Sequence, residues 1–163
     1  MIYTCTSCGL CLLHDYPGIL EIPQGRKIAE NSYDVHEYII KLINEGYVKP
    51  DFREVRRSIA YHIPCHLRAL KIGYPAAKLM SLIPGLEYEI LDDACCGLSG
   101  SYGFKKENAL TAIQIGNRAV SLISKTGMDN IVSDCGSCRM QLAGLSGMPA
   151  LDPAEIIFDS LGR

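Results

Sequence analysis

From residue 58 onward, short apolar runs alternate with segments in which apolar residues recur at helical spacing. Such runs are typical of buried β-strands, and such segments are typical of amphipathic helices. The predicted elements are strands at 58–63, 86–91 and 130–134 and helices at 75–83 and 109–125. Gly127 follows the second helix and is placed to end it, because glycine readily adopts the left-handed conformation found after helices.

The last thirty residues continue the alternation. A short helix is predicted at 137–145, a strand or turn at 148–151, and a final helix at 152–161. That final helix opens with Asp152 and Glu155 spaced as a capping box around a proline at its first position. Strands alternating with helices predict an α/β protein, a Rossmann-like layered domain with a small, mostly parallel sheet.

The start of the chain resembles its end. CTSC at 5–8 and CGSC at 135–138 each follow a short apolar run, and the segments 34–43 and 152–161 both open with Asp-x-x-Glu before apolar residues. This similarity indicates a tandem repeat whose loops differ in length.

The repeat predicts how the chain is divided. Residues 1–45 are expected to be the C-terminal remnant of a first repeat, 46–57 a polar linker, and 58–163 a complete second copy. We therefore expect the chain to be part of a longer protein, or a reduced form that finds its partner segments in another chain.

Composition narrows the functional classes. The 163 residues are 48% hydrophobic and 21% charged, which is enough apolar material for one well-buried core. A net charge of -2, with basic residues interleaved among acids, excludes a nucleic-acid-binding surface. The chain has no N-terminal signal and no apolar run of bilayer length, so we expect a cytoplasmic protein. Its eight cysteines then indicate metal or redox chemistry rather than a disulfide scaffold.

Five of these cysteines follow predicted strands: Cys65, Cys95, Cys96, Cys135 and Cys138. Three such turns from one parallel sheet meet at the carboxyl edge of its strands, and a helix N-terminus favours the anionic thiolate. Five thiolates exceed the four of a tetrahedral zinc site or a cubic 4Fe–4S cluster. The surplus indicates either a non-cubic cluster or a cube with one spare redox-active thiol.

Gly97, Gly100 and Gly103 follow the paired cysteines. Glycine lets backbone N–H groups approach cluster sulfides, so these residues fit a cluster-binding loop. Three alternatives remain at this stage: a flexible loop rich in turn residues, a vicinal disulfide, and a structural zinc domain. Zinc is also a candidate substitute in the same site.

Three motifs, YHIPCHLRAL, DDACCGLSGSYGFKKEN and DCGSCRMQL, resemble the cysteine-rich CCG domain of iron–sulfur oxidoreductases. The GSYGFKKEN tail is most similar to the C subunit of anaerobic glycerol-3-phosphate dehydrogenases, and the B subunit of heterodisulfide reductases is related. The resemblance covers residues 61–142 and implies that the cluster ligands are Cys65, Cys95, Cys96, Cys135 and Cys138, with Gly97 beside them.

The resemblance also implies a function. Family members pass electrons between a flavin-containing dehydrogenase subunit and a quinone or disulfide acceptor, next to other CCG or ferredoxin modules. We therefore expect an electron-transfer module of anaerobic respiration, cytoplasmic or peripheral on the inner face of the membrane. The alternative is heterodisulfide-type redox catalysis, in which the fifth cysteine attacks a disulfide.

The N-terminal cysteines allow two interpretations. In the repeat, Cys5 and Cys8 are the ligands of a candidate second site, and Cys11 has no role. A ferredoxin motif would also use Cys11, but its fourth cysteine would fall at residue 15, which is aspartate. We prefer the repeat. His62 and His66 flank Cys65 and are candidates for ligation or hydrogen bonding.

Overall fold

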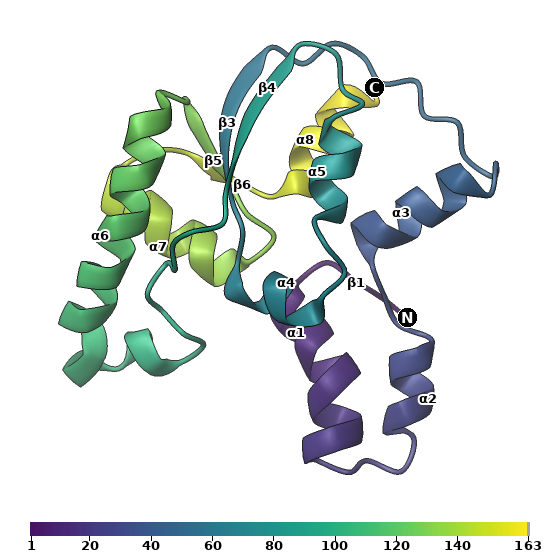
Figure 1. The fold of residues 1–163 in the computed structure, drawn as a ribbon, viewed down its shortest axis with the longest axis horizontal. Coiled ribbons are helices and arrows are strands. Elements are labelled where there is room, and N and C mark those ends of the chain that lie inside the picture. The colour runs from purple at the N-terminus through teal and green to yellow at the C-terminus, as the bar shows by residue number, and fades with distance from the viewer. Residues whose placement is uncertain (163) are drawn as a thin grey trace.

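A computed structural model describes residues 1–162 as an α/β protein with two parallel sheets (Figure 1). The elements, in chain order, are β1 (Ile2–Tyr3), α1 (Thr6–Leu10), the π-helical η1 (Cys11–Ile19), α2 (Gly25–Glu30), β2 (Tyr33–Asp34), α3 (Val35–Asn44), β3 (Arg57–His62), α4 (Cys65–Leu70), α5 (Pro75–Met80), β4 (Leu86–Leu91), the 3-10 turns η2 (Tyr102–Phe104) and η3 (Lys106–Asn108), α6 (Ala109–Thr126), β5 (Asn130–Val132), α7 (Gly136–Ser146), β6 (Ala150–Leu151) and α8 (Pro153–Ser160).

The main sheet has the strand order β4-β3-β5-β6, and every pairing in it is parallel. β3 lies at its centre, where Ile59 pairs with Tyr88 of β4 and with Asn130 of β5. The predicted α/β class and parallel sheet are confirmed. The carboxyl ends of these strands therefore share one edge, which is where open α/β sheets place their sites.

Side chains of β3 alternate between two apolar cores. Ile59 and Tyr61 face a core shared with α5 and α8, whereas Ala60 faces a second core shared with α6 and α7. Figure 1 shows these two helix pairs on opposite sides of the sheet. The strand is buried on both faces, as expected for the centre of a parallel sheet.

The smaller sheet consists of β1 and β2, also parallel, with Ile2 opposite Tyr33. Its part of the chain repeats the order of elements in β5, α7, β6 and α8, because both contain a strand, a CxxC-bearing helix, a second strand and a capped helix. In the N-terminal copy, η1 and α2 are inserted between the first helix and the second strand. The two parts are in contact, with α1 packed against α4 and α3 against α5. The division into a 1–45 remnant, a 46–57 linker and a 58–163 domain stays a prediction.

The ends of the helices follow their sequence signals. Gly127 adopts φ +69° after α6. Asp152 caps α8 and forms the predicted capping box with Glu155. Asp34 caps α3 by accepting from the backbone N–H groups of His36 and Glu37, so the two Asp-x-x-Glu segments begin their helices alike. None of the helices in residues 1–162 has the length and apolarity needed to cross a bilayer.

Candidate metal centre

Three turns bring the five predicted cysteines to the carboxyl edge of the main sheet. Cys65 opens α4 just after β3, Cys95 and Cys96 lie in the loop after β4, and Cys135 precedes α7 just after β5. Cys135 has extended backbone angles, φ -117° and ψ 117°, so the chain leaves its strand and turns directly into the helix that carries Cys138.

The five sulfur atoms form a continuous chain of hydrogen-bonding partners. The Sγ atoms of Cys138 and Cys96 lie 3.2 Å apart. Cys96 interacts in turn with Cys95, Cys95 with Cys65, and Cys138 with Cys135. Four of the five, all but Cys95, line one small hollow of about 20 Å³. The structure therefore brings all five predicted residues together.

Hydrogen bonding divides these thiols into acceptors and donors. Cys65 and then Cys96 are the main causes of a lowered pKa at Cys95. The bond from Cys138 is the main reason that the pKa of Cys135 falls to about 5. The pKa values of Cys65 and Cys138 are raised, chiefly because each donates to its lowered partner. Cys95 and Cys135 are thus the natural thiolates of the site.

Backbone N–H groups also point at the sulfurs. The N–H of Gly97 donates to Cys95 Sγ over 3.3 Å, and the N–H groups of Ser137 and Cys138 donate to Cys135. Gly97 adopts φ +93°, and a Cβ there would lie 2.1 Å from the carbonyl oxygen of Ala112 in α6. Only glycine fits this position, because both the backbone conformation and the close approach of α6 exclude a side chain.

The N-terminal cysteines form a separate group. Cys5 precedes α1, Cys8 lies within it, and Cys11 begins η1. The pKa of Cys8 is raised, first by the charge of Cys5 and also by burial, by a hydrogen bond to Cys5 and by the charge of Cys11. Cys11 is therefore close to the predicted pair, although the repeat gave it no role. The use of Cys5 and Cys8 as a second site remains a prediction.

Side chains from the N-terminal part reach the main site. Ser7 and His66 line the same hollow as the cysteines, and Ser7 Oγ lies 2.7 Å from His66 Nδ1. Ser7 is also one of the groups that lower the pKa of Cys135. His62 is buried beside Cys95, and burial lowers its pKa to about 4, so it is neutral at physiological pH.

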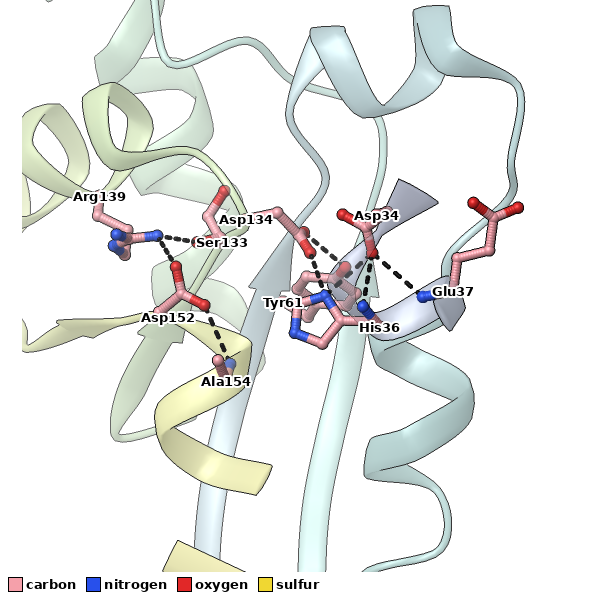
Figure 2. Close-up of polar contacts among 9 residues, drawn as sticks. All are labelled: Asp34, His36, Glu37, Tyr61, Ser133, Asp134, Arg139, Asp152 and Ala154. Carbon is pink, nitrogen blue, oxygen red and sulfur yellow. Dashed lines mark hydrogen bonds and ion pairs between the residues drawn. The ribbon is translucent and has the colours of Figure 1, made fainter. Parts of the chain in front are cut away.

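A buried polar network adjoins the Cys135 turn (Figure 2). Tyr61 donates to Asp134 Oδ2 over 2.6 Å. The Nδ1 atom of His36 lies 3.3 Å from Asp34 Oδ1 and 3.8 Å from Asp134 Oδ1, although neither ring nitrogen makes a hydrogen bond of standard geometry. His36 therefore connects an aspartate of the small sheet with one of the main sheet.

Burial and neighbouring charge compete within this network. Burial alone lowers the pKa of His36, but its interactions with Asp34 and Asp134 outweigh it, so the pKa is raised. For Asp134, burial dominates and raises the pKa to about 6. Burial likewise raises the pKa of Tyr61 far above its usual range, so its hydroxyl remains a donor.

Ser7, His36 and Asp134 were not predicted from the sequence. A serine between two cysteines and a histidine after a capping aspartate have no spacing that indicates chemistry. The one available signal was the position of Asp134 immediately before Cys135.

The arrangement of the thiols bears on the choice of metal. Across residues 1–162, no three cysteine, histidine or acidic side chains are arranged to hold a single metal ion. The sulfurs form a chain with five members rather than a tetrahedral cage of four. The zinc alternative therefore has no support. Thiolates approached by several backbone N–H groups, with a glycine at the closest contact, are a donor set that suits an iron–sulfur cluster.

Comparison with known proteins agrees with this geometry. The family model of the cysteine-rich CCG domain matches residues 59–143. The C subunit of the anaerobic glycerol-3-phosphate dehydrogenase of Escherichia coli is 29% identical over 161 residues, which cover 99% of this chain and 40% of that protein.

Two archaeal proteins are also similar. The B subunit of the CoM/CoB fumarate reductase of Methanothermobacter marburgensis is 28% identical over 145 residues, covering 87% of this chain and 27% of that protein. An uncharacterized iron–sulfur protein of Methanococcus maripaludis is 26% identical over 145 residues, which cover 87% of this chain and 26% of that protein. The chain thus spans well under half the length of these relatives.

Proposed function

Since the chain belongs to the cysteine-rich CCG domain family, we propose that it is an iron–sulfur electron-transfer module whose cluster is held by Cys65, Cys95, Cys96, Cys135 and Cys138. The observation that carries the proposal is the convergence of these thiols. Three segments far apart in the sequence place five sulfur atoms in one chain of contacts at the carboxyl edge of the sheet. A fold has no packing reason to gather five thiols in this way.

The residues around the thiols have defined tasks in this proposal. When bound, the cluster would supply reversible one-electron chemistry. Gly97 and the first turn of α7 direct N–H groups at the sulfurs, which favours the reduced state by stabilising added negative charge. The apolar core behind the site, which contains Leu98 and Leu142, limits the access of water.

We further propose that the electrons come from a flavin-containing subunit and go toward a quinone. The Escherichia coli relative is named as a subunit of a dehydrogenase, and the Methanothermobacter relative as a subunit of a reductase. A chain that aligns with parts of such subunits is expected to act beside other chains, including further CCG or ferredoxin modules. In this proposal the chain is located peripherally at the inner face of the membrane, because quinones are dissolved in the membrane lipid.

The test is the metal and acid-labile sulfide content of the chain purified without oxygen, with its visible and electron paramagnetic resonance spectra. We expect iron and sulfide in equal amounts, about four of each per cluster. Cys96→Ser should lose this cluster, because Cys96 links the two ends of the sulfur chain. Cys11→Ser is the matched control and should retain it.

The possible outcomes test the ligand set and the iron–sulfur function separately. Full iron and sulfide in Cys96→Ser would contradict the ligand set, whereas protein without sulfide under these conditions would contradict the iron–sulfur function. Far-UV circular dichroism of each variant shows whether the fold is intact. The apolar cores contain far more than the thiols, so we expect the variants to fold.

One observation favours a second function, the reduction of a disulfide. The site has one thiol more than a cube requires, and Cys65 is exposed. Once it passes its proton to Cys95, to which it donates, the exposed Cys65 can attack a disulfide, forming a mixed disulfide and releasing one thiolate. Two electrons from the cluster and its donor, with one proton, then reduce the mixed disulfide to two thiols. Cys65→Ser that keeps its cluster but loses disulfide reduction would favour this function, whereas loss of the cluster would favour simple ligation.

A further inference from the structure

We infer that the open cleft between α6 and the loop that carries Cys95 is the binding site of the electron acceptor, and that this acceptor is a quinone whose carbonyl oxygens are bound by Asn117 and Arg118. The inference rests on the proposed iron–sulfur function. It gives that function a place where electrons leave the chain.

The cleft adjoins the thiol site at one cysteine. Its volume is about 530 Å³, which lies within the range of small-molecule sites. One wall is the segment 93–95 of the loop after β4. The other wall is α6, which contributes Gln114, Ile115, Asn117, Arg118, Ser121 and Leu122. Cys95 therefore belongs both to the chain of thiols and to a cleft that an organic molecule can enter.

The sizes of the two cavities decide where an acceptor binds. The hollow lined by the other four cysteines has about 20 Å³, which is roughly the space that a single water molecule needs. An organic acceptor does not fit there. Of these two cavities, the cleft at Cys95 is the one that admits it. A molecule bound in the cleft lies against the half-buried side chain of Cys95 and so is next to the site that delivers the electrons.

The α6 wall offers hydrogen-bond donors beside apolar surface. Its polar residues recur at positions i, i+3, i+4 and i+7, namely Gln114, Asn117, Arg118 and Ser121. Residues at this spacing lie along the same side of a helix. Amide, guanidinium and hydroxyl groups all donate to carbonyl oxygens. Ile115 and Leu122 lie in the same wall. This combination suits a flat ring that carries carbonyl groups.

The charges of the cleft favour a neutral ligand. Arg118 on one wall and Asp93 on the other are both exposed, and neither forms an ion pair within residues 1–162. Their charges cancel, so the cleft has no net charge to attract an anion. Asp93 would also repel a carboxylate. The carbonyl of a quinone accepts from Arg118 without that cost.

Reduction of a quinone balances with what the proposed function supplies. Conversion of the quinone to its quinol takes two electrons, which come from the flavin-containing donor, and two protons. The cleft is open to solvent, so water supplies the protons. No side chain of the cleft has to change its own charge during the reaction.

The first test is a proton–nitrogen NMR titration of the reduced, metal-free chain with 2-methyl-4-quinolone. This compound has the ring carbonyl of a quinone but neither accepts electrons nor adds to thiols. We expect saturable shifts in the signals of residues 93–95 and 114–122. Arg118→Met should weaken binding about tenfold, because a hydrogen bond from a charged donor is lost.

Arg26→Met is the matched control. Arg26 lies in α2, outside the cleft, is exposed, and loses the same charge in this variant. It should bind the quinolone as the native chain does. Equal binding by the two variants, or the absence of shifts in the cleft, would overturn the inference.

The second test mixes the reduced, cluster-loaded chain with duroquinone without oxygen and follows reoxidation by visible absorbance. We expect the rate to saturate with quinone concentration, and the half-saturating concentration to rise about tenfold in Arg118→Met. Ser121→Phe fills the cleft and should abolish both the saturation and the NMR shifts. A rate that rises linearly in the native chain would contradict a binding site. If no cluster assembles, the proposed function fails, and the NMR titration still decides whether the cleft binds the ring.

Discussion

At the scale of single residues, Gly97 is the position least able to accept a side chain. Its φ of +93° is unfavourable for any other residue, and a Cβ would lie 2.1 Å from the carbonyl oxygen of Ala112, which belongs to the backbone of α6. We predict that Gly97→Ala lowers the free energy of unfolding by at least about 2 kcal/mol, the sum of backbone strain and displacement of the helix. It should also weaken cluster retention, because the N–H to Cys95 moves with the loop.

Gly100 provides the control for that prediction. It also has a positive φ, +63°, but a Cβ there would have no atom within 4 Å. Gly100→Ala should cost about 1 kcal/mol, from backbone strain alone. Urea unfolding of both variants, with iron analysis of each, makes the comparison. Equal losses of unfolding free energy in the two variants would show that the close contact between Gly97 and α6 does not contribute to stability.

The buried carboxyl of Asp134 predicts a pH dependence. Its pKa rises from 3.8 to about 6 on folding, first because of burial, so the folded chain binds more protons than the unfolded chain between these values. The stability from this group is fully present below pH 3.8 and is lost as the pH rises through 6. The shift corresponds to about 3 kcal/mol.

Asp134→Asn tests this directly. We expect the variant to lack that loss, so that between pH 4 and pH 6.5 its unfolding free energy gains about 2 kcal/mol relative to the native chain. Urea titrations of the reduced, metal-free chains at several pH values provide the measurement. A difference between the two chains that stays constant across this window would contradict the raised pKa.

Part of the site could be predicted at this scale and part could not. Cysteine has few roles in a reduced protein, so Cys95 and Cys96 together with a CxxC pair indicated one site without a structure. Ser7 and His36 act through contacts with residues more than fifty positions away in the sequence, such as His66 and Asp134. Nothing in their local sequence distinguishes them from ordinary surface positions.

At the scale of elements, Asp152 at the N-terminus of α8 has two structural roles. Asp152 caps the helix through Ala154 N–H, and its Oδ2 also accepts from Arg139, which in turn donates to the carbonyl of Ser133 (Figure 2). The cap thus connects α8 to α7 and to the end of β5. We predict that Asp152→Ala destabilises the chain by about 2 kcal/mol, which is the upper end for a lost cap.

The control lies on the same helix. Asp159 is half-exposed and pairs with Arg57 over 3.0 Å. Because exposed ion pairs contribute little, Asp159→Ala should cost less than about 1 kcal/mol. The two variants are compared by urea unfolding at pH 7. If Asp159→Ala lowers the free energy of unfolding as much as Asp152→Ala does, the cap contributes no more to stability than the exposed ion pair.

Elements also differ in how far the sequence reveals them. α6 spans eighteen residues with buried positions at Ala112, Gly116, Ala119 and Ile123, a spacing that periodicity detects easily. α1 and α2 have five and six residues, too few for a periodic pattern. The π-helical η1 contains Pro17, which normally indicates a break. Tertiary contact, rather than local preference, holds these three elements.

At the scale of the whole molecule, the N-terminal part completes the rest. Ile39, Ile40 and Ile43 of α3 pack against the core that contains α5 and β3. From the same part, His36 reaches Asp134 and Ser7 reaches His66. A true linker and an independent second domain would not require such contacts. We therefore expect residues 46–163 to be less stable alone than within the full chain.

Deletion of residues 1–45 tests this expectation. Exposing the apolar surface under three half-buried isoleucines should lower the free energy of unfolding by at least about 3 kcal/mol. Urea midpoints of the shortened and full chains give the measurement, and Ile40→Ala with Ile43→Ala in the full chain separates lost packing from lost polar contacts. If the shortened chain unfolds at the same urea concentration, residues 58–163 are an independent domain. The influence of the N-terminal part on the thiol site would then be confined to polar contacts such as the one between Ser7 and His66.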